Sequence, residues 1–253
     1  LLMHDAGHQQ IFNSSWKNKA MALLTGNLVT GISAGSWDIN HNRHHSSPND
    51  DEDPDIHIPL LAHSEEQALQ KKGIVRLVAK YQAFYWLPLM VVSGFSVKTN
   101  HQVNAVRMLL KRQNAAYHSL DVLLLAVNAI AYFGLLFHVM GVWKSLVFFI
   151  VHHAFTGLYM GTVFATNHKG MPLLIGKERP DFLRLQVLTT RNVKSNPIID
   201  LWTGGLNYQI EHHLFPTMPR KNLGKAKKLI ESFCTRAGIE YYETGFFRSY
   251  AEI

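Results

Sequence analysis

The sequence predicts an all-α integral membrane protein in which a transmembrane helical hairpin carries a helical cap on its cytoplasmic side. Two observations predict this fold class. Two apolar runs contain no charged residue, Val122–Trp143 with 22 residues and Ser145–His168 with 24. Each run is long enough to cross the roughly 30 Å hydrocarbon core of a bilayer as a helix. The second observation is that histidines recur at helical spacing outside these runs.

Only Lys144 separates the two runs, so we expect crossings at about residues 120–143 and 145–167 joined by a tight turn. Basic residues flank the pair on both sides, at Lys98, Arg107, Lys111 and Arg112 before it and at Lys169, Lys177, Arg179 and Arg184 after it. Because positively charged loops stay in the cytoplasm, both flanks are predicted to lie there.

A third uncharged stretch, Tyr81–Val97, is a marginal candidate for a crossing because it has 17 residues and contains Pro88. A crossing here would place histidine clusters that share a site on opposite sides of the membrane. We therefore expect this stretch to lie in the interface or to re-enter the bilayer.

Composition excludes several classes of protein. The net charge is +7, which fits positive-inside membrane topology, and no arginine-rich tract with interleaved aromatic residues indicates nucleic-acid binding. Cys234 is the single cysteine, so a disulfide within the chain and cysteine-rich metal sites are excluded. We interpret residues 1–253 as one domain that starts directly at a histidine cluster, which predicts a fragment lacking an upstream apolar hairpin.

The central motif is the segment His41-Asn42-Arg43-His44-His45. Its three histidines lie at positions i, i+3 and i+4, which share one face of an α-helix with neighbouring Cβ atoms roughly 5–6 Å apart. Imidazole is a ligand for iron, zinc, copper and nickel. The motif therefore predicts a metal site.

Two further clusters repeat this pattern. His4 and His8 lie at i and i+4, and Gln209, His212 and His213 repeat the i, i+3, i+4 spacing with glutamine in the first place. The three clusters hold seven histidines, whereas a tetrahedral zinc site uses four ligands. If they converge, the cap holds a di-metal site; the alternative is a set of solvated histidines at helix ends.

Other histidines receive separate interpretations. His168 follows the second crossing and is predicted to be an eighth histidine ligand on the same membrane face. His152 lies 16 residues earlier, too far along a straight helix to share that metal, so we interpret it and His153 as packing or cavity-lining residues. No ligand role is expected for the remaining five, which are His57, His63, His101, His118 and His138.

Acidic residues near the clusters are candidates for orienting a ligand histidine through its other ring nitrogen. Asp53 and Asp55 belong to the acidic segment after the central motif, where a solvated loop is the alternative. Asp5 and Glu211 lie inside the outer clusters, and Glu211 is equally consistent with a solvated residue or a direct ligand.

Two helices are predicted outside the hairpin. Ser64-Glu65-Glu66-Gln67 is a capping box that starts a helix running toward Tyr81. Near the C-terminus, helically spaced apolar residues predict an amphipathic helix on the cytoplasmic side; they are Leu223, Ala226, Ile230, Phe233 and Ala237. Its basic residues are interpreted as solvated near anionic lipid, with docking of an acidic electron donor as the alternative.

The three clusters resemble the histidine boxes of the membrane fatty acid desaturases, in order and in separation, over nearly the whole chain. The segments 165–172 and 204–208 are similar to those of bacterial acyl-lipid or acyl-CoA desaturases. Gln209 at the start of the third box is typical of the front-end subgroup, which places a double bond between an existing one and the carboxyl end. Sphingolipid desaturases share this glutamine, which leaves the substrate open.

The resemblance implies a di-iron centre with two iron ions per chain, O2 as co-substrate, and a fatty acyl lipid or acyl-CoA as substrate. The implied ligands are His4, His8, His41, His44, His45, His168, Gln209, His212 and His213. Many front-end members carry a fused b-type cytochrome with an HPGG motif, which this sequence lacks, so a separate ferredoxin or b-type cytochrome is the expected electron donor.

Other functions are compatible with the same residues. A lipid hydroxylase on this scaffold differs only in returning oxygen to the substrate. A zinc-dependent membrane receptor or hydrolase also uses histidine clusters on helices, but predicts fewer ligands and no dependence on O2.

Overall fold

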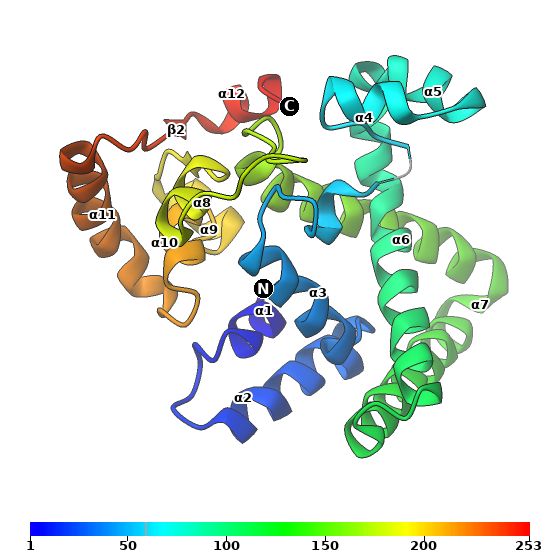
Figure 1. Ribbon diagram of the computed structural model, residues 1–253. Coiled ribbons are helices and arrows are strands. Elements are labelled where there is room, and N and C mark those ends of the chain that lie inside the picture. Colours follow the sequence, from blue (N-terminus) through cyan, green and yellow to red (C-terminus); the bar gives the residue numbers. More distant parts are fainter. Residues whose placement is uncertain (59) are drawn as a thin grey trace. The chain divides into compact units, whose positions relative to one another are not determined.

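The structure, a computed structural model, describes residues 1–58 and 60–253 and is mostly helical over them (Figure 1). It divides into two compact units. The first unit comprises Leu1–His41 and Pro88–Met160, and the second comprises Asn42–Leu87 and Gly161–Ile253. Three helices contribute residues to both units: α3 (Ala34–Ser46), α6 (Gln82–Leu110) and α7 (Ala115–His168).

The N-terminal part of the first unit is a cluster of short helices. Its elements before α3 are α1 (Leu2–Gly7), α2 (Ser15–Ala22) and the π-helix η1 (Leu23–Thr30). They pack around a small apolar core formed by Ala6, Ala22, Leu23 and Ala34. Gly31 ends η1 with φ of 69°, a left-handed conformation that glycine adopts without strain. The turn brings α3 back against α1.

The buried carboxylate of Asp121, on α7, forms hydrogen bonds to this cluster of short helices. Asp121 Oδ2 accepts a hydrogen bond from Ser33 Oγ at 2.6 Å, and Asn27 Nδ2 donates to both the Asp121 side chain and its carbonyl oxygen. Asn27 Oδ1 in turn accepts from the backbone N–H of Ala34, at the start of α3. The network fixes where α3 begins, and α3 carries the central histidine motif.

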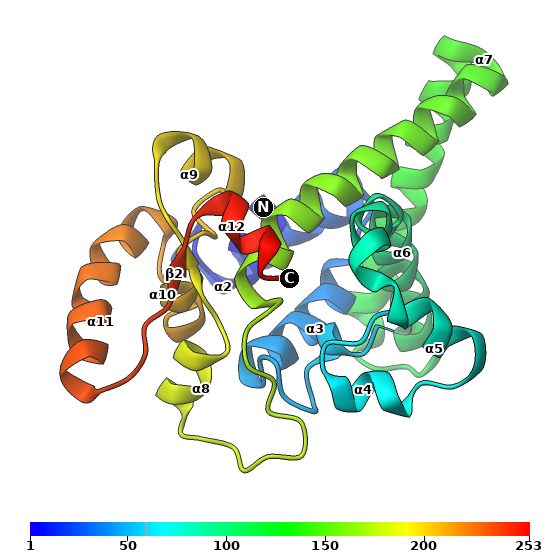
Figure 2. The ribbon, with the colours of Figure 1, turned by 90° about the horizontal axis from the view of Figure 1, so that it is seen from above.

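Helix α7 folds back on itself. Its 54 residues are interrupted at Gly141, where φ is 70° and ψ is 171°. Tyr132 OH lies 2.7 Å from His152 Nδ1, although 20 residues would span roughly 30 Å of straight helix. Figure 2 shows the two arms side by side. The sequence predicted this reversal at Lys144, and the structure makes it three residues earlier because glycine accepts the positive φ.

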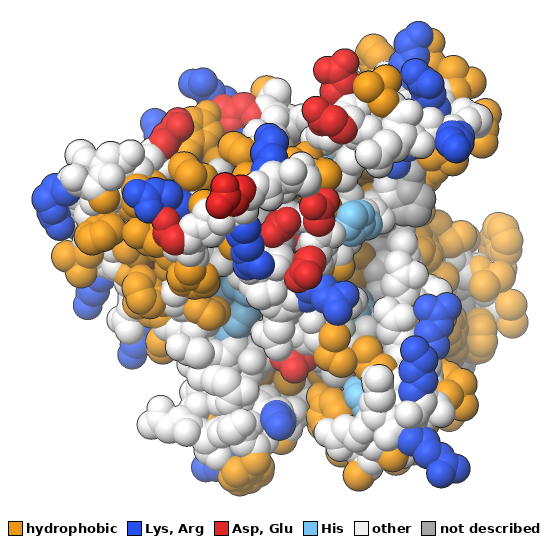
Figure 3. Space-filling view, viewed as in Figure 1, with side chains coloured by type: hydrophobic (Ala, Val, Ile, Leu, Met, Phe, Trp, Pro, Cys, Tyr) orange, Lys and Arg blue, Asp and Glu red, His pale blue; other side chains and the backbone are white. Residues whose placement is uncertain are grey.

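Within the described residues, α7 is the one helix long and apolar enough to cross a membrane. Many of its apolar side chains face outward, and Figure 3 shows hydrophobic side chains gathered over its end at the right of the view. The most exposed examples are Ile130, Leu135, Val139, Val142, Trp143, Val151 and Phe155.

Helix α6 is longer than the uncharged stretch Tyr81–Val97, the marginal candidate for a crossing. The structure joins the uncharged stretch and the basic segment after it into one helix, Gln82–Leu110, with Pro88 in its interior. Within the first unit, α6 crosses α7 at a pair of glycines. A Cβ added at Gly94 would lie 2.1 Å from the carbonyl oxygen of His153, and one at Gly157 would lie 2.4 Å from that of Met90. The two backbones therefore touch directly.

The second unit starts with the end of α3, the 3-10 turn η2 (Pro54–Ile56) and two short helices, α4 (Glu65–Gln70) and α5 (Gly73–Lys80). The predicted cap at Ser64 is confirmed, because Ser64 Oγ accepts from the N–H of Gln67 at 3.2 Å, whereas Gln67 Oε1 accepts from the N–H of His63 and not from that of Ser64. The helix it starts is shorter than expected. It ends at Gln70 because the next residue, Lys71, is extended, and α5 and α6 follow as separate helices.

The C-terminal part of the second unit holds its apolar core. Its elements are α8 (Phe182–Leu188), β1 (Asn192–Val193), α9 (Pro197–Thr203), α10 (Gln209–Leu214), η3 (Arg220–Asn222), α11 (Leu223–Ala237), β2 (Glu243–Thr244) and α12 (Phe246–Ala251). Helices α8, α10 and α11 meet in a core that includes Val187, Ile210 and Ile230.

Two details of this part differ from the sequence interpretation. On α11 the buried residues are Leu223, Ala226, Ile230 and Cys234, whereas Phe233 is 49% exposed and Ala237 is exposed. The fold is also not purely helical, because β1 and β2 form a parallel pair of two residues each. Segments this short carry no alternating pattern for a sequence argument to detect.

Candidate metal centre

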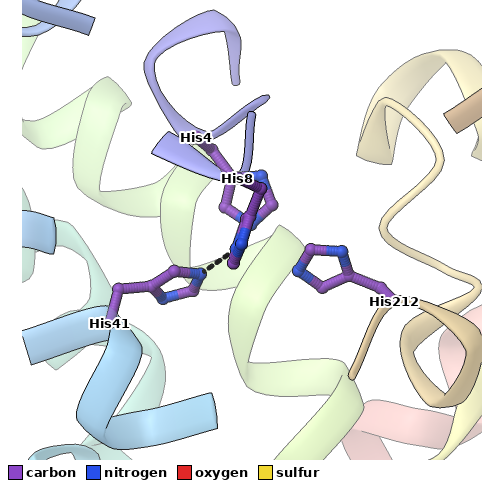
Figure 4. A group of neighbouring side chains, drawn as sticks. All are labelled: His4, His8, His41 and His212. Atoms are coloured by element: carbon purple, nitrogen blue, oxygen red, sulfur yellow. Dashed lines mark hydrogen bonds between the residues drawn. The ribbon is translucent and has the colours of Figure 1, made fainter. Parts of the chain in front are cut away.

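The first unit brings together three of the predicted ligands. His4 lies on α1, His8 directly follows it, and His41 lies on α3; Figure 4 shows their rings facing one another. His8 Nε2 and His41 Nε2 are 2.8 Å apart, and the ring centroid of His4 lies 4.7 Å and 5.0 Å from those of His8 and His41. These three residues offer ring nitrogens that all lie within 4.8 Å of one another.

Aromatic packing positions this group. Trp37 lies four residues before His41 on α3, and the two rings stack with centroids 4.3 Å apart. Gly7 lies against Trp37 so closely that an added Cβ would be 2.3 Å from the indole. The glycine between His4 and His8 is therefore required for α1 to approach α3. Asp5 Oδ1 lies 3.5 Å from His4 Nδ1, at the predicted position beside a ligand ring.

The second unit assembles a buried group from three elements. His44 comes from α3, His168 from the end of α7 and His213 from α10, and their ligand nitrogens lie within 4.8 Å of one another. His44 Nε2 is 3.3 Å from His168 Nε2. The chain distance between these two histidines is 124 residues. The structure thus brings His168 to the second and third boxes, as the sequence interpretation expected.

The remaining two histidines of these boxes border the same group. His45 and His213 stack with ring centroids 4.1 Å apart and an interplanar angle of 19°. His212 meets His45 edge-on at 4.8 Å. All five histidines of this group are buried.

Asp53 directly contacts the ring of His44, a predicted ligand. Its carboxylate oxygens lie 3.0 and 3.1 Å from His44 Nδ1, and they also accept the backbone N–H groups of Asn49 and Asp55. Burial opposes protonation of His44, but the hydrogen bond to Asp53 and the charges of Asp55 and Asp53 together raise the pKa of His44 overall. Burial works to raise the pKa of Asp53, but the hydrogen bond and charge of His44 and the two backbone N–H groups together lower it overall. Asp55 Oδ2 lies farther away, at 3.6 Å, and Asp55 is largely exposed.

Gln209 reaches the group through His168. Its amide nitrogen lies 3.0 Å from His168 Nε2, and its carbonyl oxygen accepts from Asn167 Nδ2 at 3.2 Å. Because Asn167 Nδ2 also donates to the Leu206 carbonyl oxygen, the asparagine presents a donor to Gln209 and thereby fixes which end of the glutamine faces His168.

Glu211 has a different environment from Asp53. It is fully buried, and its carboxylate accepts from Tyr241 OH at 2.6 Å and from Asn192 Nδ2 at 2.7 Å. Asn192 Oδ1 also accepts from the backbone N–H of Ile210. Burial raises the pKa of Glu211 despite these bonds. Both carboxylate oxygens are therefore used in holding α10 to β1 and to the chain before β2.

Sequence reasoning missed several polar residues that support the group. Asn49 adopts a left-handed φ of 55°, and its side chain donates to the carbonyl oxygens of His168, Pro172 and Thr189. Gln186 on α8 contacts both His45 and His213. The sequence offered a signal only for Asn49, because asparagine tolerates the left-handed backbone region and is therefore a candidate for a turn. Gln186 lies within an apolar helix, and the sequence offered no signal for its role.

The donor set of the second group fits a bound metal ion. His213 Nε2 is buried without a hydrogen-bond partner among the described residues, while its Nδ1 is held by Gln186. Burial, followed by the neighbouring imidazoles, lowers the pKa of His168 and of His213 well below the usual value. Neutral imidazoles with one nitrogen anchored and the other directed inward are the form in which histidine binds metals.

These features define a mostly helical protein with an apolar helical hairpin and clustered, buried histidines. The model of the fatty acid desaturase family matches residues 1–245. The chain belongs to the fatty acid desaturase family, which is membrane-associated and implies a metal centre. The resemblance inferred from the histidine boxes is therefore confirmed.

Several relatives of the chain are named as desaturases. The chain is 33% identical to an acyl-lipid (9-3)-desaturase of Physcomitrium patens over 95% of its own length and 46% of the relative. It is 33% identical to a Delta(6)-fatty-acid desaturase of Caenorhabditis elegans over 99% of its own length and 59% of the relative. It is 34% identical to a Delta(8)-fatty-acid desaturase of Euglena gracilis over 95% of its own length and 59% of the relative. The chain spans about half the length of these curated relatives.

Proposed function

We propose that this chain is the catalytic part of an O2-dependent desaturase that inserts a double bond into the acyl chain of a fatty acyl lipid or acyl-CoA. The observation that carries the proposal is the buried group around His44, His168 and His213, whose ligand nitrogens lie within 4.8 Å of one another. Membership of the desaturase family supports the reaction class.

The proposed reaction balances without a protein nucleophile. Two hydrogens leave adjacent carbons of the acyl chain, and together with two electrons and two protons from outside they reduce one O2 to two waters. Two iron ions would activate O2 for attack on an unactivated C–H bond, a chemistry that side chains alone do not supply. The proposed ligands are His4, His8 and His41 in the first unit and His44, His45, His168, His212 and His213 in the second, with Gln209 as a further candidate.

The protein's own residues would hold the ligands in one orientation. The Asp53 carboxylate would accept a hydrogen bond from the Nδ1–H of His44, which leaves Nε2 directed at His168. Asn49 ties the Asp53 loop to the chain that follows α7. Because a ligand held in place loses little conformational entropy when it binds, this scaffold favours a metal at the site.

We further propose front-end regiochemistry. Relatives carry the names Delta(6)- and Delta(8)-fatty-acid desaturase, and Gln209 occupies the first place of the third box. We propose that the α7 arms cross the membrane twice, that the histidines lie at the cytoplasmic face, and that a separate ferredoxin or b-type cytochrome donates the electrons. The outward-facing apolar residues of α7 support the membrane assignment.

The test is conversion of a labelled acyl substrate by host cells that express the wild-type protein or the His44→Ala variant. Because His44 belongs to the proposed ligand set, the variant is expected to lose conversion. The exposed His57 supplies the matched control, and His57→Ala should convert normally. Retained conversion in His44→Ala would remove His44 from the site.

Metal and product analysis separate the proposal from its rivals. The purified protein should contain about two iron ions per chain, whereas one zinc ion and no iron would favour a receptor or hydrolase. A product gaining the mass of one oxygen would identify a lipid hydroxylase, and conversion of a ceramide-linked chain would identify a sphingolipid desaturase.

A further inference from the structure

Gln186 is a side chain of the second unit that bonds to members of both the second and the third histidine box. It lies on α8 and is fully buried. Its Nε2 donates to the carbonyl oxygen of His45 at 2.9 Å, and its Oε1 lies 2.9 Å from His213 Nδ1. The chain distance from Gln186 to His45 is 141 residues.

The geometry leaves one orientation for this amide. A backbone carbonyl oxygen only accepts, so the group facing His45 is the NH2 of Gln186 and the group facing His213 is its carbonyl oxygen. A carbonyl oxygen also only accepts, so His213 must carry its proton on Nδ1. The lone pair of His213 is then on Nε2, the nitrogen that is buried without a hydrogen-bond partner in the described structure.

The bond to His45 completes the end of α3. The last carbonyl groups of a helix have no N–H from the following turn. The N–H of Asn49, four residues after His45, donates to Asp53 instead, and Gln186 supplies the donor that the His45 carbonyl needs. Because the His45 and His213 rings also stack, Gln186 holds both partners of that stack.

We propose that Gln186 is a positioning residue, which sets the tautomer and the ring orientation of His213 and thereby the affinity of the site for its metal. The inference rests on the metal-binding part of the proposed function. Gln186 does not contact the proposed reacting atoms; it acts through His213 and through the backbone of His45.

The experiment compares Fe²⁺ binding by the wild-type protein with that of Gln186→Met, Gln186→Glu and Gln82→Met, all purified in detergent. Each is loaded with Fe²⁺ under anaerobic conditions, and the rate of release to a chelator and the affinity are measured beside thermal unfolding. Gln186→Met keeps the volume but loses both bonds, and we expect Fe²⁺ affinity to fall about 10–100-fold.

Gln82 is the matched control, because it is a partly buried glutamine whose side chain accepts from the N–H of Ala62 and donates to its carbonyl oxygen. Gln82→Met should lose thermal stability and keep the wild-type Fe²⁺ affinity. Gln186→Glu retains an acceptor for His213 Nδ1 and loses the donor to His45. It should unfold more easily than Gln186→Met yet release Fe²⁺ more slowly.

The outcomes separate positioning from packing. If Fe²⁺ release follows thermal stability across all variants, or if Gln186→Met matches Gln82→Met, the positioning role is overturned. If Gln186→Glu does not fold, the comparison of the two methionine variants decides. A wild-type protein that binds Fe²⁺ tightly but converts no acyl substrate would overturn the proposed function and leave the role of Gln186 standing; one that binds no Fe²⁺ would overturn both.

Discussion

Asp53 shows how a single residue of an acidic run acquires a specific role. It is fully buried, whereas Asp51 and Glu52 beside it are exposed. Its carboxylate joins the two backbone N–H groups of its own loop to the ring of His44. A buried carboxylate with these three partners is satisfied, so it stabilises the loop while it orients the ring.

Replacing Asp53 by asparagine should weaken metal binding while retaining the fold. The amide oxygen still accepts one backbone N–H, but the amide no longer offers the paired charge to His44, and we expect a loss of about 10–100-fold in metal affinity. Iron content and acyl conversion measure the effect. Asp55→Asn is the control, with a smaller effect expected because that carboxylate is exposed and 3.6 Å away. Equal effects of the two variants would contradict the role of Asp53.

At the scale of elements, the crossing of α6 and α7 depends on two glycines. We predict that Gly157→Ala destabilises the first unit by about 1–3 kcal/mol, because the new Cβ would lie 2.4–2.7 Å from backbone atoms of α6. Gly134→Ala is the control in the same helix, where nothing lies within 4 Å and alanine should be neutral or stabilising. Thermal unfolding in detergent measures both; equal stability of the two variants would show that the backbones are not in contact.

A second contact joins Arg191, the residue before β1, to the C-terminal helix α12. The buried Arg191 donates to the carbonyl oxygens of Thr166, Lys169 and Ser249 and pairs with Glu252 at 3.0 Å. Burial works to raise the pKa of Glu252, but hydrogen bonds from Tyr242 and Thr244 and the charge of Arg191 lower it overall.

This lowered pKa predicts the sign of a pH effect. A carboxylate with a depressed folded-state pKa stabilises the fold above its unfolded pKa, about 4.3 for glutamate, and this contribution is lost as pH falls through the folded value. Wild type should therefore be more stable than Glu252→Gln at neutral pH, with the difference shrinking in acid. Thermal unfolding across this pH range tests it, with the exposed Glu240→Gln as control. A difference that is constant with pH would contradict the assignment.

At the scale of the whole molecule, the proposed topology makes a labelling prediction. In a Cys234→Ser background, cysteines at Lys111 and Lys177 should react with an impermeant maleimide from the cytoplasmic side. A cysteine at Lys144 should react only from the opposite side, because it follows the reversal of α7 at Gly141. Labelling of all three from one side would rule out two crossings by the α7 arms.

The sequence by itself determined the features that depend on local spacing. The two apolar runs predicted the α7 hairpin, the positions i, i+3 and i+4 predicted which histidines share a helix face, and the Ser64 capping box predicted a helix start. The exact turn at Gly141 was missed because any break between the runs satisfied the pattern, and only the backbone angles identify the glycine.

Tertiary structure alone decided which polar residues support the histidines. Within the second unit, the carboxylate of Asp53 contacts a histidine ring, whereas that of Glu211 accepts from Tyr241 and Asn192. Gln186 joins His45 to His213. The physical reason is that a buried polar group takes whichever partner packing brings within about 3 Å. Spacing along one helix predicts which histidines share a face, but partners more than a hundred residues away are fixed only when the helices pack.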